Sequence, residues 1–304
     1  MISYLSPYIQ RKIWGGERLS LLKGLKHSSD LEPIGETWEI SIHPEGTSFV
    51  DGKKLDLSPN ESKLPYLVKL IDTNEELSVQ VHPDDSYALK HEGGTGKSEC
   101  WYILEAKNGS GIYLGLKPGV TKEFFVSSIK SNQNINELLN FYPVKKGEFF
   151  FVPAGSIHAI GGGITLAEVQ QNSGITYRVW DWNRLDKNGQ SRELHIEKSL
   201  DVINFKEECN QESYFCHLKS LEDNRGRTTL IDFKSFNLSL INLKKGENCI
   251  LNVNDQVRFP SVLSLGGMLK INGQKLNEYD AVLIRDESSL ECEALTDCSF
   301  LFIE

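Results

Sequence analysis

The chain has 304 residues, of which 39% are hydrophobic, 25% charged and 10% aromatic, so it can bury a substantial core and is not intrinsically disordered. Its net charge of −9, from 33 basic and 42 acidic residues, argues against duplex DNA or an anionic membrane surface as the main partner. A small anionic substrate stays open, because a single pocket with a few Lys or Arg side chains binds a phosphate whatever the overall charge.

The sequence shows no targeting or membrane-spanning segment. Residues Met1–Pro7 lack a basic stretch followed by an apolar one, and no run approaches about 18 uncharged apolar residues. The six cysteines form no C-x-x-C pair, so we expect buried free thiols rather than a thiolate zinc site or a redox motif. We therefore predict a cytoplasmic protein that binds neither nucleic acid nor a membrane. Its oligomeric state stays open.

The first part of the chain has a β pattern: short runs rich in Val, Ile, Phe, Tyr and Trp, separated by Gly, Pro, Asn and Asp. Strands are predicted over residues 38–42, 66–71, 77–82 and 100–104. Helical patterns occur at 121–129 and at 134–141, where Asn134 and Glu137 have the spacing of a capping box. We interpret residues 116–142 as a short helical insertion between strands, after which Gly147–Val152 returns the chain to the sheet.

The pattern changes after about Phe205. Residues 206–228 are polar and charged, which predicts a connection, and alternating strands separated by Gly-Gly, Asn-Gly and Tyr-Asp turns resume over 229–304. We predict a mainly all-β fold of two jelly-roll β-barrels, the first over 1–205 and the second over 229–304. The second segment contains no histidine, so we expect no metal there.

The window Gly147–His158 has the spacing G-x5-P-x-G-x2-H, which resembles the second signature of the cupin superfamily. Phe149 and Phe151 alternate with Phe150 and Val152, which predicts a strand buried on both faces. The following Pro-Gly turn then directs His158 toward a cavity. A lone histidine after a strand is more often structural, so the prediction of a metal site depends on further ligand residues elsewhere in the sequence.

Two further segments supply such partners. Gln80 and His82 lie on one face of a predicted strand, because side chains alternate with period two, and Pro83 then ends the strand. Glu99 alternates in phase with Trp101 in the next strand. A set of two imidazoles and one carboxylate suits Zn²⁺ or Fe²⁺ with positions left for water or substrate. Taken singly, Glu99 could be exposed and His82 could cap a strand; together with His158 they predict a metal site.

Motifs across residues 14–184 resemble type I mannose-6-phosphate isomerase in its short bacterial form, a family within the cupin superfamily. The resemblance implies a catalytic cupin domain paired with a metal-free one. The motifs occur in the order expected for that family: Trp14–Gly16, Gly35–Ser41, Pro65–Lys69, Leu77–Asp85, Gly96–Tyr102, Val152–Ala159 and Tyr177–Arg184.

The resemblance implies a zinc-dependent interconversion of mannose 6-phosphate and fructose 6-phosphate, with one zinc ion per chain and a small sugar phosphate as the partner. It also implies roles for individual side chains: His82, Glu99 and His158 as zinc ligands, Gln80 as a weaker amide-oxygen ligand, Arg178 as the catalytic arginine and Lys97 as a substrate contact. Where many members have Asn-Ser-Asp, this chain has Asn172-Ser173-Gly174, so an aspartate there cannot transfer a proton.

Isomerisation of an aldose to a ketose moves a proton between C1 and C2 through a cis-enediol, and negative charge develops on the carbonyl oxygen. The resemblance implies that zinc stabilises this charge as a Lewis acid and that Arg178 stabilises it as a hydrogen-bond donor. The candidate bases are Lys97 and then Glu168. Two alternatives stay open: Lys97 contacts only phosphate, or Glu168 only holds Arg178 in place. Further positive charge at the mouth could come from Arg184, Arg192 and Lys198.

Two other functions use a similar ligand set. A cupin non-haem iron oxygenase usually takes two ligands from a His-x-His pair, and Gln80 replaces the first of these here, which weakens that alternative. A non-catalytic cupin that binds sugar phosphates is the other, and the presence of Arg178 beside the ligands argues against it.

Overall fold

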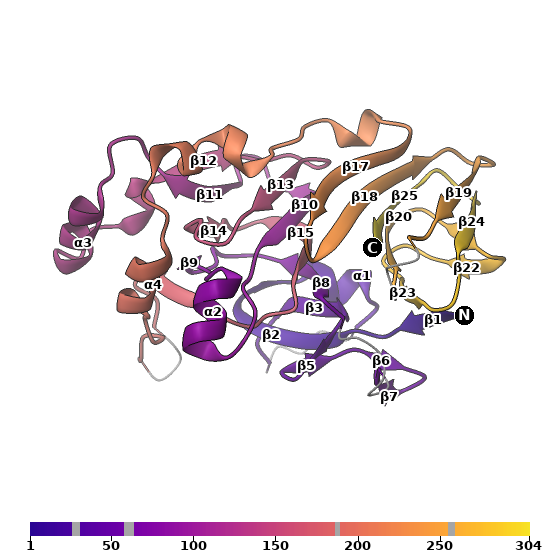
Figure 1. Ribbon diagram of the computed structural model, residues 1–304, viewed down its shortest axis with the longest axis horizontal. Helices are drawn as coiled ribbons and strands as arrows, with labels where there is room; N and C mark the ends of the chain where they lie inside the picture. Colours follow the sequence, from indigo (N-terminus) through magenta and orange to yellow (C-terminus); the bar gives the residue numbers. More distant parts are fainter. Residues whose placement is uncertain (26–30, 58–63, 186–188, 255–258) are drawn as a thin grey trace.

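The computed structural model describes residues 1–25, 31–57, 64–185, 189–254 and 259–304, and strands predominate in it (Figure 1). This confirms the predicted mainly β fold. Within these ranges, none of the helices has the length and apolar character needed to cross a membrane.

The N-terminal unit is built on two large antiparallel sheets, with two short two-stranded sheets beside them: β4 (Ile42–His43) with β5 (Gly46–Thr47), and β6 (Phe49–Val50) with β7 (Lys53–Lys54). The six-stranded sheet has the order β13 (Phe149–Val152), β10 (Glu99–Ala106), β15 (Ile164–Gln171), β8 (Tyr66–Asp72), β3 (Ile34–Ile40) and β2 (Tyr8–Gly16). The five-stranded sheet has the order β12 (Leu139–Pro143), β11 (Gly111–Leu116), β14 (His158–Ile160), β9 (Val79–Val81) and β16 (Tyr177–Trp180).

The C-terminal unit repeats this arrangement with a six-stranded and a four-stranded sheet. The first has the order β1 (Ile2–Leu5), β23 (Ala281–Ile284), β20 (Ser261–Gly266), β25 (Cys298–Ile303), β18 (Phe236–Leu243) and β17 (Gly226–Phe233). The second has the order β19 (Asn248–Asn252), β24 (Ser289–Ala294), β21 (Leu269–Ile271) and β22 (Gln274–Leu276). The N-terminal strand β1 pairs with β23, so it lies in the second unit and not with residues 6–205.

The alternation of side chains builds a separate core on each face of the six-stranded sheets. Trp101 and Ile103 of β10 lie in the core between the two sheets of the N-terminal unit. Tyr102, one residue apart from each, lies in the core that joins this unit to Leu240 and Leu301 of the other. The two six-stranded sheets therefore pack against each other, with a further sheet outside each. Among the described residues the large sheets of each unit share no strand, so neither unit closes into a continuous barrel.

The helices are short, and the first, which follows β2, packs beside β3 and β8 with Leu19 in the core between the two units (Figure 1). They are α1 (Arg18–Leu22), α2 (Asp85–Glu92), α3 (Lys122–Lys130) and α4 (Ile196–Val202), with 3₁₀ turns at Ile135–Leu138, Glu207–Asn210, Glu212–Phe215 and Leu221–Asp223. Helix α3 confirms the prediction over 121–129, and Thr121 caps it by accepting from the Phe124 N–H. The predicted helix over 134–141 is wrong: one 3₁₀ turn leads directly into β12, whose backbone pairs with β11.

Candidate functional site

A cavity of about 290 Å³ opens in the N-terminal unit beside the predicted metal ligands. Its lining includes most of the side chains that the sequence singled out: Gln80, Lys97, Glu99, Glu168 and Arg178. They come from strands of both sheets of the unit, because β10 and β15 belong to the six-stranded sheet and β9 and β16 to the five-stranded one. The fold thus brings together residues that are far apart in the chain.

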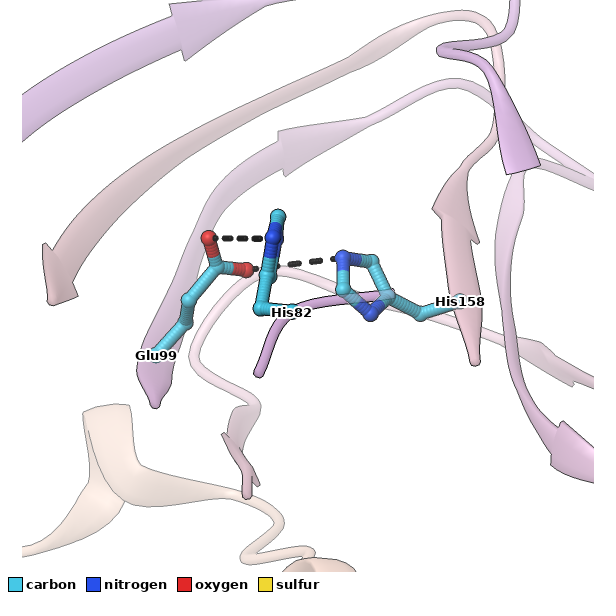
Figure 2. Close-up of side chains that lie close together, drawn as sticks. All are labelled: His82, Glu99 and His158. Atoms are coloured by element: carbon cyan, nitrogen blue, oxygen red, sulfur yellow. Dashed lines mark ion pairs between the residues drawn. The ribbon is translucent and has the colours of Figure 1, made fainter. Parts of the chain in front are cut away.

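The two histidines and Glu99 form one compact, buried cluster (Figure 2). His82 Nε2 lies 3.2 Å from Glu99 Oε1, and His158 Nε2 lies 3.6 Å from Glu99 Oε2. One ligand atom from each of the three side chains lies within 4.8 Å of the others. Gln80 lies at the edge of this cluster, with Nε2 at 3.3 Å from His158 Nε2. The cluster can hold a metal ion, and the four side chains that we predicted as ligands are together.

Both imidazoles present Nε2, and not Nδ1, to the cluster. Nδ1 of His82 lies 2.9 Å from the carbonyl oxygen of Ile175, and Nδ1 of His158 lies 2.9 Å from that of Ser156. A carbonyl oxygen only accepts, so Nδ1 is the donor in each ring and Nε2 of the neutral imidazole keeps its lone pair toward Glu99. Outer hydrogen bonds of this kind fix the tautomer of metal-binding histidines.

Electrostatics hold the cluster in the protonation state that a cation needs. Burial lowers the pKa of His82 to about 3, and the charge of Lys97 adds to the effect; burial also lowers the pKa of His158. Burial alone would raise the pKa of Glu99, but the charge of Lys97 holds it well below its usual range. The two imidazoles are therefore neutral and the carboxylate is ionised at pH 7, which is the form that binds metals.

A cation already lies against this carboxylate. Lys97 Nζ is 2.7 Å from Glu99 Oε1 and 3.4 Å from His82 Nε2. Within the described part of the chain, neither Glu99 oxygen accepts a hydrogen bond of good geometry, although the side chain is 1% exposed. A buried carboxylate with unused acceptor positions is costly unless a cation satisfies it. The donor set and the acceptor positions left open on Glu99 fit a metal ion.

The turn before His158 explains how the strand end reaches the cluster. Gly155 has φ +85°, a conformation that L side chains rarely adopt, and a Cβ there would lie 3.0 Å from the carbonyl oxygen of Val202. The Gly155 N–H also donates to the carbonyl oxygen of His82 at 2.8 Å. The Pro-Gly turn predicted from the sequence therefore joins the segments that carry the two histidines.

A second buried charge network lines the cavity from strands β15, β8 and β3 of the six-stranded sheet. Lys69 Nζ lies 3.0 Å from Glu168 Oε1 and 3.7 Å from Glu36 Oε2, and Trp101 Nε1 donates to Glu168 Oε2 at 3.0 Å. Burial and the charge of Glu99 raise the pKa of Glu168, although Lys69 opposes them. Burial would lower the pKa of Lys69, but the carboxylates of Glu168 and Glu36 raise it.

The roles of Lys69 and Glu36 escaped the sequence analysis. Both lie within motifs that we quoted for the family resemblance, and a charged residue inside an apolar strand such as Tyr66–Ile71 is a signal in itself, because an unpaired charge is rarely buried. Their partner could not be found without the register that places Glu168 opposite Lys69 in the β15–β8 pair.

Positive charge gathers at the mouth through arginines after His158. Arg178 donates from Nη1 to the carbonyl oxygen of Glu193 at 2.8 Å, and its Nε has no hydrogen-bond partner among the described residues. Arg192 also lines the cavity, and buried Asp181 accepts from its Nε and Nη2 at 2.6 and 2.5 Å. Arg184 also forms an ion pair with Asp181, at 2.5 Å, but does not line the cavity. Lys198 does not line it either, and forms an exposed ion pair with Glu92 at 2.7 Å.

Comparison with protein families matches one segment of each unit to a different description. A model of the phosphomannose isomerase type I catalytic domain matches residues 53–106, which include Lys69, Gln80, His82, Lys97 and Glu99. A model of the quercetinase C-terminal cupin domain matches residues 223–304. The second match agrees with the sheet arrangement of the C-terminal unit.

Relatives extend the similarity over most of the chain. A mannose-6-phosphate isomerase of Streptococcus mutans is 41% identical over 234 residues, or 72% of this chain and 73% of the relative. One of Bacillus subtilis is 37% identical over 256 residues, 79% of each chain. The crystal structure of the mannose 6-phosphate isomerase from Bacillus subtilis superimposes with a TM-score of 0.80 at 28% identity, covering 100% of this chain and 99% of that one. By its relatives, its fold and its catalytic-domain match, the chain belongs to the type I phosphomannose isomerase family.

Proposed function

We propose that the protein interconverts mannose 6-phosphate and fructose 6-phosphate as a zinc-dependent aldose–ketose isomerase. The observation that carries the proposal is the buried His82, Glu99 and His158 cluster at a cavity that also contains Arg178 and the Glu168–Lys69 pair. A metal-ligand set, a fixed cation and a buried carboxylate are the groups that proton transfer next to a carbonyl needs. The relatives named for this activity support it.

We assign the zinc ligands to His82, Glu99 and His158, with Gln80 as a fourth, weaker one. Two neutral imidazoles and a carboxylate are a common ligand set for catalytic zinc, which keeps a position open. Zinc bound there supplies a Lewis acid beside the sugar carbonyl.

Arg178 stabilises the enediolate. Its side chain lines the cavity next to Gln80, its register partner in the β16–β9 pair, so its guanidinium lies on the ligand side of the cavity. The bond from Nη1 to Glu193 fixes the guanidinium, while the buried Nε without a partner remains available to an oxyanion. A donor oriented before the reaction costs no reorganisation when the charge develops.

Glu168 is our first choice as the base. Its carboxylate lines the cavity, its raised pKa brings it nearer to neutral pH, and Lys69 and Trp101 hold both of its oxygens. Lys97 makes its closest contact with the Glu99 carboxylate, as an ammonium group does, so we assign it to substrate binding rather than to proton transfer.

Arg192 is our candidate for the phosphate group. It lines the cavity beside Arg178, and Asp181, which is 5% exposed, holds it through two hydrogen bonds. Its remaining guanidinium donors suit a phosphate, which accepts several charge-assisted hydrogen bonds. The negative total charge of the protein describes its outer surface and does not oppose this local binding.

The test is a coupled isomerase assay over several hexose phosphates, with purified protein reconstituted with zinc and with a chelator added. We expect fructose 6-phosphate from mannose 6-phosphate, and no product after chelation. Oxygen consumption by iron-loaded protein would instead support an oxygenase, and sugar-phosphate binding without turnover would support a non-catalytic cupin.

All six cysteines are free thiols, which supports a reducing, cytoplasmic location.

A further inference from the structure

A turn of the C-terminal unit contacts two residues, Asp85 and Gln171, that hold the segment before Glu99. The two-residue turn between β17 and β18 consists of Lys234 and Ser235. Lys234 forms an ion pair with Asp85, and Ser235 Oγ accepts a hydrogen bond from Gln171 Nε2 at 3.2 Å. These contacts connect the C-terminal unit to two residues close to the predicted metal ligands.

Gln171 lies at the end of β15 on the face opposite the cavity. Alternation along β15 directs Glu168 to the cavity and Val169 to the core shared with the C-terminal unit, and Gln171 follows the phase of Val169. The side chain is 4% exposed, so its amide needs partners inside the protein. It lies where the two units meet, and not in the reacting cavity.

The amide of Gln171 is bonded at both ends. Its Oε1 accepts from the Ser98 N–H at 3.0 Å, and its Nε2 donates to Asp85 Oδ1 at 3.1 Å as well as to Ser235. Its backbone N–H also donates to the Ser98 carbonyl oxygen at 3.1 Å. Asp85 Oδ1 in turn accepts from the Gly96 N–H at 2.8 Å. The backbone of residues 96–98 is therefore held by Gln171 on one side and by Asp85 on the other.

The same short segment joins the parts of the chain that carry all three candidate ligands. The Lys97 N–H donates to the carbonyl oxygen of Pro83, the residue after His82, at 3.0 Å. Ser98 Oγ accepts from the Ala154 N–H, in the turn before His158, at 3.1 Å. Glu99 follows directly in β10. A shift of Ser98 would therefore move Glu99 relative to both histidines.

We propose that Gln171 is a positioning residue, which holds Ser98 so that Lys97 and Glu99 face His82 and His158, and that the β17–β18 turn supports it through Ser235. This gives the C-terminal unit a role at the site of the other unit. The inference rests on the proposed function, because it takes Glu99 to be a metal ligand. Residues that orient metal ligands typically change metal affinity or activity by about 10- to 100-fold when they are replaced.

The test variant is Gln171→Glu in the full-length protein. It keeps the size and the acceptor for Ser98 but places a second carboxylate oxygen next to Asp85. We expect zinc affinity, measured by competition with a chromophoric chelator, to fall by about tenfold or more, and kcat to fall with little change in KM. Adding Asp85→Asn removes the facing charge, and we expect it to recover most of the lost affinity.

Ser235→Ala tests the contribution of the C-terminal unit, with an expected loss of a few-fold in zinc affinity. Ser299→Ala is the matched control: it removes another serine hydroxyl of that unit, which donates to Asn242 Oδ1 at 2.6 Å, and should leave zinc affinity unchanged. Normal zinc affinity and kcat in Gln171→Glu, even with a lower melting temperature, would overturn the inference. If the wild-type protein binds no zinc, the proposed function fails and the inference with it.

Discussion

Replacing Glu168 by glutamine removes the proposed base and keeps the shape of a side chain that is 3% exposed. A glutamine can still accept from Trp101, but its amide cannot take a proton from the sugar. Loss of a general base lowers turnover by about 10²- to 10⁴-fold. Glu168 is not among the candidate ligands, so we expect zinc content to stay at that of the wild-type protein.

The substitution also costs stability, which a control has to separate from catalysis. It leaves Lys69 without the carboxylate 3.0 Å away and with only Glu36 at 3.7 Å. Breaking a buried ion pair typically costs about 3–5 kcal/mol. Glu39→Gln breaks the comparable buried pair with Lys23, at 2.8 Å, on a side chain that is outside the cavity lining. Both variants should unfold at lower temperature, and only Glu168→Gln should lose turnover.

The measurement is kcat at saturating mannose 6-phosphate for both variants, together with zinc content and thermal unfolding. The assignment of Glu168 as the base would be refuted by a kcat within about threefold of that of Glu39→Gln, since a general base contributes at least about 10²-fold. Lys97 would then be the remaining candidate from the sequence.

Three further outcomes follow from the site. Arg178→Ala should keep zinc but lose about 10²- to 10³-fold in kcat, the usual effect of removing one oxyanion donor, and near-normal turnover would remove Arg178 from the mechanism. Arg192→Ala should raise KM for mannose 6-phosphate by about tenfold or more with little change in kcat; an unchanged KM would exclude it as a phosphate ligand. Burial lowers the pKa of His82 to about 3 and also lowers that of His158, so below the ordinary histidine pKa of about 6.5 the unfolded chain binds protons that the folded protein does not. The free energy of unfolding of the zinc-free protein should therefore fall as pH drops from 6.5 to 5, by up to about 1.4 kcal/mol per pH unit for His82, with a further decrease from His158. The free energy of unfolding, measured in urea at each pH, should depend less on pH in His82→Gln than in the wild-type protein, and an equal pH dependence would contradict the pKa direction.

The ligand cluster was predictable from local patterns. Period-two alternation placed Gln80 with His82, and a Pro-Gly turn directed His158, so the geometry depends on a few residues around each ligand. The structure brings these side chains within hydrogen-bonding distance of one another or of Glu99. Strand ends that converge on one cavity can be recognised in the sequence, because each is followed by characteristic turn residues.

Pairs of residues far apart in the sequence could not be predicted from local patterns. Strand β1 has four residues, and nothing local indicates that Ile2 pairs with Ile284 in the C-terminal unit. Lys69 and Glu168 became partners only through the β15–β8 register. The helix predicted over 134–141 had a capping-box pattern, but pairing of the backbone with β11 outweighed that weak local preference.

The supporting role proposed for Gln171 was also beyond the sequence. A glutamine at the end of an apolar strand is compatible with a surface position, but here it is buried among Asp85, Ser98 and the β17–β18 turn. Such contacts between units depend on how two cores meet, which propensity and alternation do not encode.

The central claim is that the cavity beside His82, Glu99 and His158 converts an aldose phosphate into a ketose phosphate with a metal bound. The most direct measurement follows mannose 6-phosphate by proton NMR after mixing with protein that holds one equivalent of zinc. We predict that fructose 6-phosphate appears, and that its formation stops when a chelator removes the zinc. A protein that holds zinc and leaves mannose 6-phosphate unchanged would contradict the account.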